Sequence, residues 1–303
     1  MPKYFIEDID SFKETYNECF LYILPGSLTE HWVETNVMSI FIYDLIDKQQ
    51  YIVNCKHSDF PTTKNLINLK DKLKGDLYIY NKNLVGKFFP NAYDVNLLYW
   101  LKYNEKIDTD LPTEIKEYYK WYPKKKTINA IIPISLWISY IRNLKIQFQE
   151  ICDKTIPGAD FYNHGLNLFS QIEKNKIRCN LQILSKFHPY TKNYLLNHYN
   201  FYTSTGRPSN SYGNINLAAL DKASGIRKSI IPSENNNLIE FDYDAMHIRL
   251  IANLLRVPLP SSNLHTYFGR LYFKTPILDK ETLQKSKNLT FRFLYGTIDK
   301  EFT

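Results

Sequence analysis

The chain has 303 residues, of which 44% are hydrophobic and 23% are charged. This composition can bury an ordinary globular core, so it excludes a disordered tail, and the length allows one large domain or two smaller ones. The formal net charge of +7 fits an anionic partner such as nucleic acid, although many basic enzymes carry a similar excess. Aromatic residues make up 15% of the chain and either stack on exposed bases or fill ordinary cores.

The cysteines and the apolar segments exclude further classes of protein. The four cysteines are scattered and include no CxxC pair, which argues against a zinc site and a disulfide framework and indicates a reducing compartment. The N-terminus is acidic and lacks the basic start and apolar stretch of a signal peptide. The most apolar stretch, Ala130 to Ile141, contains Pro133 and is shorter than the roughly 20 residues that cross a bilayer. We therefore expect no membrane role.

Up to about Lys145, helical patterns alternate with short apolar segments that predict strands. This mixture indicates an α/β domain with a mixed sheet. The strand candidates are FLYILPG at 20–26, MSIFIYDL at 38–45, QQYIVN at 49–54 and DLYIY at 76–80.

The remainder of the chain is richer in helical patterns. The basic, turn-rich stretch Trp121 to Thr127 is predicted to be a surface loop. A helix is predicted from about Ile134 through Ile151, and a second one runs through Glu173. The next predicted elements are a polar loop at 203–216, a strand at 238–244 that ends in acidic residues, and a helix at 280–295.

An ordered series of short motifs runs through the last third of the chain. Its members are Thr205-Gly206-Arg207, Gly225-Ile226-Arg227, Asp242 to Arg249, Leu264-His265-Thr266, and Lys287 to Gly296. Each motif alone is weak, but their order and approximate spacing resemble those of the family A DNA polymerases, in which they read TGRLSS, IR, DYSQIELR, DIHT and RRxAKxxNFGxxYG. The resemblance implies template-directed DNA synthesis from dNTPs on a primer-template.

The resemblance also implies two-metal catalysis with Mg²⁺. Nucleotidyl transfer needs metal ions to neutralise charge and activate the primer hydroxyl, and a carboxylate at the end of a rigid strand can hold both ions. Asp242 stands at that position, and Tyr243 stands where the family lends a backbone carbonyl to the metal. Read by itself, Asp242 could equally cap the helix that follows.

The family binds the triphosphate with cations from separate elements. By resemblance these are Arg227, His265 and Lys287, and Lys287 is also expected to be catalytic. Phe291 and Tyr295, at positions i and i+4, would form the face on which the incoming base pair stacks, although this spacing is also common in core packing.

The primer-template is expected to contact the polar loop at 203–216. Arg207 resembles the arginine that reaches the minor groove at the primer end, where it contacts acceptors common to all base pairs. Asn214 and Asn216 are further candidate DNA-binding residues in this loop.

Several positions depart from the family pattern. Leu283 replaces the leading arginine of the fingers helix, and Arg292 replaces a glycine. His247 occupies the place of the glutamate that lies beneath the sugar and excludes ribose, so nucleotide binding at His247 is expected to discriminate less against ribonucleotides.

Residues 1–145 resemble the 3′-5′ exonuclease domain of the same family, which is ribonuclease H-like. That nuclease needs carboxylates in the patterns DxE, HNxKFD and YxxxD. Residues 80–85 align with the second pattern and place Val85 where the aspartate belongs, and Asp94 resembles the strand-end aspartate of a later segment. One remaining carboxylate cannot hold two metals, so an inactive domain without exonuclease activity is expected.

Residues 146–303 are expected to form a partial polymerase domain with palm and fingers elements. The thumb is expected to be reduced or absent, because few residues separate the apparent domain start at Ile172 to Asn180 from Thr203. The family's second metal carboxylate lies in an HDE motif beyond the fingers helix. We therefore expect the N-terminal part of a split or truncated polymerase, viral or bacterial, in the cytoplasm or another reducing compartment, completed by a second polypeptide. The alternative is a non-catalytic DNA-binding or replication-accessory module.

Overall fold

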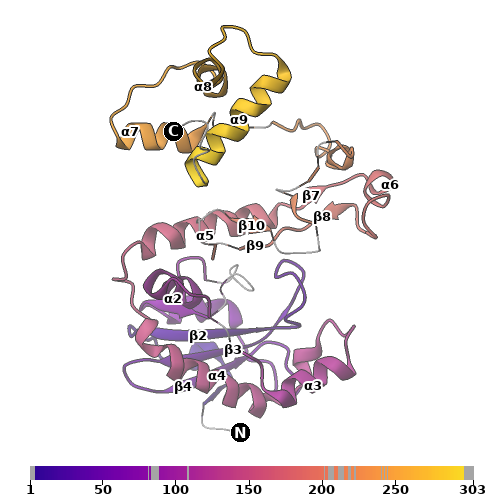
Figure 1. Cartoon of the computed structure of the whole chain (residues 1–303). Coiled ribbons are helices and arrows are strands. Elements are labelled where there is room, and N and C mark those ends of the chain that lie inside the picture. Colours follow the sequence, from indigo (N-terminus) through magenta and orange to yellow (C-terminus); the bar gives the residue numbers. More distant parts are fainter. Residues whose placement is uncertain are drawn as a thin grey trace. The chain divides into compact units, whose positions relative to one another are not determined.

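The chain forms two compact units, Met1–Asn235 and Asn236–Thr303 (Figure 1). The computed structural model describes residues 4–80, 82, 89–107, 109–200, 202–203, 208–210, 215–217, 220–221, 223–239, 241, 243 and 245–296, the last range without the side chain of Tyr295.

The first unit is built on a six-stranded mixed sheet. In chain order its strands are β1 (Phe5–Ile6), β2 (Cys19–Pro25), β3 (Val37–Asp44), β4 (Gln50–Asn54), β5 (Leu77–Ile79) and β6 (Tyr93–Asp94). The order across the sheet is β1-β4-β3-β2-β5-β6. Strands β2, β3 and β4 are antiparallel neighbours, β1 is parallel to β4, β5 is parallel to β2, and β6 is parallel to β5. The predicted α/β class with a mixed sheet is confirmed.

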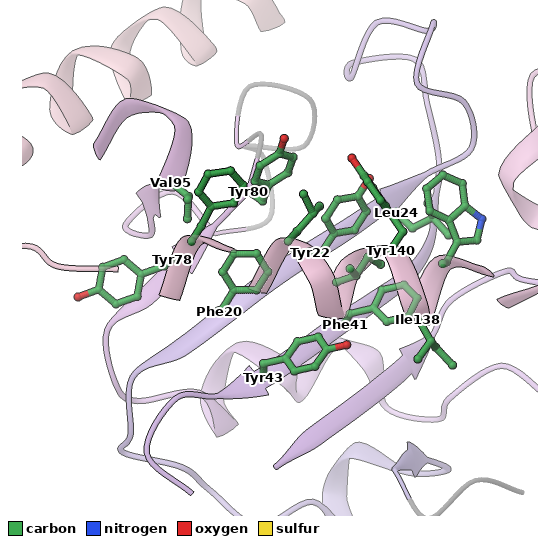
Figure 2. Close-up of a cluster of buried hydrophobic side chains, with 14 of the residues drawn as sticks. Phe20, Tyr22, Leu24, Phe41, Tyr43, Tyr78, Tyr80, Val95, Ile138 and Tyr140 are labelled. Carbon is green, nitrogen blue, oxygen red and sulfur yellow. The ribbon is translucent and has the colours of Figure 1, made fainter. Parts of the chain in front are cut away.

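The central strands are buried on both faces. Every residue of β2 and β3 is buried, so these strands read as continuous apolar runs rather than as an alternation. Successive side chains point to opposite faces. Phe20 and Tyr22 pack on one side in a cluster with Tyr140 of the long helix α4 (Ile134–Phe148), as Figure 2 shows. Leu21 belongs to a separate cluster on the other side.

Helices and small hairpins complete the first unit. The helices are α1 (Leu69–Lys72), α2 (Val95–Tyr103), α3 (Thr113–Trp121), α4, α5 (Ala159–Lys174) and α6 (Leu181–Leu184). The hairpins pair β7 (Ile177–Arg178) with β8 (Tyr194–Leu195), and β9 (Tyr199–Asn200) with β10 (Ser209–Asn210). Short 3-10 turns lie at Ile9–Ser11, Leu66–Asn68, Ile128–Ala130, Gln149–Ile151 and Ile226–Ser229.

Helix ends in this unit follow local chemistry. Asp94 caps α2 by accepting bonds from the backbone N–H groups of Asn96 and Leu97, and Asn104 ends the helix in the left-handed region with a φ of 56°. Gly158 precedes α5 with a φ of 83°, a conformation that a residue with a Cβ rarely adopts. The expected domain boundary at residue 145 lies within α4, and the division itself stays a prediction.

The second unit contains α7 (Met246–Leu254), α8 (Leu264–Phe273) and α9 (Lys280–Tyr295). The predicted helix at 280–295 is confirmed. The strand predicted at 238–244 is wrong for the residues that the structure covers there, because Leu238, Ile239, Phe241 and Tyr243 are exposed and outside any strand. The regular elements described in this unit are helices, so no strand lies there to satisfy the backbone of this segment.

None of the helices in the described ranges combines the length and the apolar character that crossing a bilayer requires.

Candidate nucleotide-binding site

Two capped helices of the second unit carry most of the described nucleotide-site candidates. Asn263 caps α8 by accepting a bond from the N–H of Thr266 at 3.0 Å. Asp279 caps α9 in the same way, with the N–H of Thr282 as donor at 2.7 Å. These caps fix the residues at which the two helices begin.

Close packing joins α8 to α9. The hydroxyl of Ser286, fully buried on α9, donates to the backbone carbonyl of His265 at 2.7 Å. A Cβ added to Gly269 of α8 would lie 2.6 Å from the Cδ1 of Leu278 and 3.0 Å from the Cβ of Ser286. Only glycine allows this approach without movement of a neighbour. The hydroxyl of Thr290 lies 3.4 Å from that of Tyr272, one turn further along each helix.

This packing brings two predicted residues together. The rings of His265 and Phe291 have centroids 5.6 Å apart and planes inclined by 53°. Lys287 is exposed and lies one turn before Phe291, on the same face of α9. The α8–α9 junction thus carries an imidazole in contact with an aromatic ring, with an exposed lysine one helical turn away. Such a surface can bind an anionic group beside a flat one.

Two further candidates lie at or just before α7. Ala245 precedes the helix with a φ of 48°, and His247 in its first turn is exposed. The side chain of Tyr243 is 80% exposed. Arg249 connects α7 with the segment leading to α8, because its guanidinium donates to the carbonyl of Pro260 at 3.1 Å.

The remaining candidates lie in the first unit or outside the described residues. In the first unit, the Nε of Arg227 donates to the carbonyl of Leu220 at 2.9 Å while the side chain stays exposed, and Asn216 is exposed as well. Outside the described residues lie Val85, Arg207, Asn214 and Asp242, together with the side chain of Tyr295.

The exonuclease-like region has a buried ammonium beside its one matching carboxylate. The Nζ of Lys82 donates to the carbonyl of Pro90 at 2.8 Å, to that of Ala92, and to the amide oxygen of Asn163 at 3.2 Å. Burial lowers the pKa of Lys82 to about 8, and the charge of Asp94 acts in the opposite direction. Burial likewise raises the pKa of Asp94 to about 6. Lys82 is not among the predicted site residues, and its signal in the sequence is a lysine just after an apolar strand.

A third group of polar side chains could hold a metal ion. His31, Glu173 and His198 each offer one ligand atom, and these atoms lie within 4.8 Å of one another. Burial lowers the pKa of His198 to about 4 and raises that of Glu173 to about 7. Burial also lowers the pKa of His31, and both shifts favour the neutral imidazole, the form that binds metals. The sequence contains no motif for this group, because its members are far apart along the chain.

Comparison with known proteins gives no family. No protein-family model matches the chain, and no curated protein matches it. Its function must therefore be inferred from the motif series and from the geometry described above.

Proposed function

We propose that this chain carries palm and fingers elements of a family A DNA polymerase, which performs template-directed DNA synthesis with Mg²⁺ once a segment with the family's HDE motif, in the same polypeptide or in a second one, supplies the other metal carboxylate. The observation that carries the proposal is the α8–α9 junction. The resemblance assigns His265 and Lys287, 22 residues apart along the chain, to one nucleotide site. The hydrogen bond from Ser286 to His265 holds the two helices that carry them together.

The chemistry of the junction suits an incoming dNTP. The exposed ammonium of Lys287 is available to the triphosphate, where it would neutralise the charge that develops on the leaving pyrophosphate. His265 would add a second donor to the phosphates. The half-buried ring of Phe291 beside it would support the base, a role that the resemblance also gives to Tyr295.

Metal binding in this proposal requires Asp242 together with a carboxylate from the HDE segment. Asp242 and the backbone carbonyl of Tyr243 would supply one side of a two-metal Mg²⁺ site. Two ions about 4 Å apart need a second carboxylate, which the family provides in its HDE motif. Arg227 would contact the triphosphate, His247 the sugar, and Arg207, Asn214 and Asn216 the DNA.

Exposed apolar side chains in the second unit support a protein partner. Leu250 and Leu254, one turn apart on α7, are 48% and 81% exposed, and Phe241 is 88% exposed. The segment 238–243 has the sequence pattern of a strand but pairs with none among the described residues. An apolar helix face beside an unpaired strand sequence favours a partner that adds strands to this segment.

The sheet of the first unit supports an exonuclease-like ancestry. Apart from the edge strand β1, the strands follow the order β4-β3-β2-β5-β6. Strands β4, β3 and β2 are antiparallel neighbours, β5 is parallel to β2, and β6 is parallel to β5, as in a ribonuclease H-like sheet. The buried ammonium of Lys82 next to Asp94 is incompatible with a metal ion in the same place. The proposed domain is therefore inactive as a nuclease.

Primer extension tests the proposal at the α8–α9 junction. The chain is combined with the polypeptide that carries the HDE motif, and Lys287→Ala and Phe291→Ala are compared with Lys70→Ala, an exposed lysine on α1. We expect Lys287→Ala to lower the rate of synthesis at least about 100-fold, as loss of a group that stabilises transition-state charge does. Full activity in Lys287→Ala, or unaltered DNA binding without any synthesis in the wild type, would favour the non-catalytic module.

A further inference from the structure

Three side chains that the polymerase proposal does not use meet inside the first unit. His31 lies in the connection between β2 and β3, Glu173 in the last turn of α5, and His198 just before β9. His31 and Glu173 are 2% and 5% exposed, whereas His198 is half-buried. Three segments that are distant along the chain thus deliver two imidazoles and one carboxylate to one place, with their ligand atoms within 4.8 Å of one another.

The carboxylate of Glu173 is held in a fixed orientation. The backbone N–H of Tyr199 donates to its Oε1 at 2.7 Å, and the indole N–H of Trp32 donates to its Oε2 at 2.5 Å. Each carboxylate oxygen has two acceptor sites, so both retain capacity for an ion. Carboxylates that bind metals are commonly oriented by hydrogen bonds of this kind.

The distance from Glu173 to His198 suits two ligands of one ion. The Nδ1 of His198 lies 3.8 Å from the Oε1 of Glu173, too far for a hydrogen bond. Ligands at about 2.0–2.1 Å from a tetrahedral zinc ion are roughly 3.4 Å apart. A small inward movement of either side chain therefore gives the bound geometry.

His31 is held in a defined tautomer. The backbone N–H of Val33 donates to its Nδ1 at 3.3 Å, so the ring proton is on Nε2, which donates to the carbonyl of Asn197 at 2.5 Å. In a metal-bound histidine, one ring nitrogen usually donates to a backbone carbonyl or a carboxylate, and the other nitrogen keeps the lone pair that binds the metal. Nδ1 therefore carries the lone pair through which His31 would bind an ion.

We propose that His31, Glu173 and His198 bind one zinc ion. Imidazole and carboxylate ligands suit Zn²⁺, whereas Mg²⁺ and Ca²⁺ prefer oxygen ligands throughout. The three ligands are different residues from Asp242 and Tyr243, which the proposed Mg²⁺ site uses. A bound ion would join the β2–β3 connection, the end of α5 and the segment before β9, with water as the fourth ligand. Its role is to stabilise the first unit.

Metal titration of the full-length chain tests this site without any measurement of DNA synthesis. After treatment with a chelator, calorimetry should give one Zn²⁺ per chain, Co²⁺ should give the visible spectrum of a tetrahedral site, and Zn²⁺ should raise Tm. Groups that hydrogen-bond to a metal ligand contribute roughly 10- to 100-fold to metal affinity. Glu173→Gln and His198→Gln each remove a ligand itself and should weaken Zn²⁺ binding by more than this. Trp32→Phe, which removes the indole donor, should weaken it within that range.

His164→Gln is the matched control, because His164 is exposed on the same helix as Glu173. It should bind Zn²⁺ as the wild type does. A folded wild-type chain that binds no Zn²⁺, or equal losses in His164→Gln and His198→Gln, would overturn the proposal and leave the three residues as a hydrogen-bonded interior cluster. Because the wild type and Trp32→Phe keep all three ligands, the test stands even where a ligand variant fails to fold.

Discussion

The hydroxyl of Ser286 donates to the backbone carbonyl of His265 at 2.7 Å, and this bond joins the two helices that carry the proposed dNTP contacts. It can form because Gly269 has no side chain where the helices approach most closely. The relative position of His265 and Phe291 therefore depends on one small residue on each helix.

Gly269→Ala tests this dependence. The added methyl group would lie 3.0 Å from the Cβ of Ser286, so α9 must shift, and such overpacking costs about 1–3 kcal/mol of stability. Urea unfolding should show this loss, and dNTP binding by the reconstituted enzyme should weaken. Gly165→Ala in α5 is the control, because its methyl group meets nothing within 4 Å and should stabilise the chain by up to about 1 kcal/mol. Equal behaviour of the two variants would show that close packing of α8 on α9 is not required.

Lys82→Met should destabilise the first unit in a pH-dependent manner. Loss of the ammonium removes a cation whose charge acts on the buried carboxylate of Asp94, and it leaves the carbonyls of Pro90 and Ala92 without this donor, at a cost of about 1–3 kcal/mol for each buried polar group left unsatisfied. The pKa of Asp94, already raised to about 6 by burial, should rise further, so stability should fall more steeply as pH increases through and above that value.

Asp94 and Lys82 should contribute opposite slopes to the pH dependence of stability. Between about pH 4 and 6 the folded state binds more protons through Asp94 than the unfolded state does, so the contribution of Asp94 to stability falls as pH rises. From about pH 8 to 10.5 the folded state binds fewer protons through Lys82, so the contribution of Lys82 rises with pH. Other groups titrate in both ranges, so the slope due to the lysine is measured as the difference between the urea unfolding of the wild type and that of Lys82→Met from pH 4 to 10. Identical profiles of the two proteins would show that the lysine is not buried. The double variant Lys82→Met/Asp94→Asn should recover most of the loss at pH 7.

The first unit should not degrade DNA. Only one matching carboxylate remains beside Lys82, and a labelled single strand should stay intact with either Mg²⁺ or Mn²⁺. The informative control is Asp94→Asn, which keeps a side-chain oxygen for the cap of α2. Metal-dependent trimming that is present in the wild type and absent from Asp94→Asn would show an active nuclease.

His247→Glu should improve the selection of deoxyribonucleotides. The side chain is exposed in the first turn of α7, so the substitution does not disturb a core. Imidazole lacks the fixed acceptor geometry of a carboxylate. The ratio of dNTP to ribonucleotide incorporation by the reconstituted enzyme should therefore increase. An unchanged ratio would place the selection of the sugar at another residue.

Local patterns were sufficient to predict much of the fold. Strands β2 to β5 and helix α9 follow from apolar runs and helical spacing that operate within a few residues. The segment at 238–244 shows the limit, since a strand pattern needs a neighbouring strand that the described part of its unit does not supply.

Contacts between distant segments could not be predicted. Glu173 bonds to Trp32, 141 residues earlier, and Lys82 bonds to Asn163, 81 residues later. Neither pair has a sequence spacing that signals it. The absence of CxxC pairs excludes a zinc site built on cysteines but says nothing of a site made of two histidines and a glutamate. By contrast, His265 and Phe291 were expected together only through the motif series, and they do lie together.

Primer extension in magnesium tests the central claim most directly, with this chain alone, with the HDE-containing polypeptide alone, and with both. The account predicts synthesis only in the mixture, because each chain holds part of the two-metal site. Asp242→Ala should abolish synthesis in the mixture while both chains still associate. Extension by this chain alone, or an unchanged rate with Asp242→Ala, would contradict a polymerase site shared between two chains.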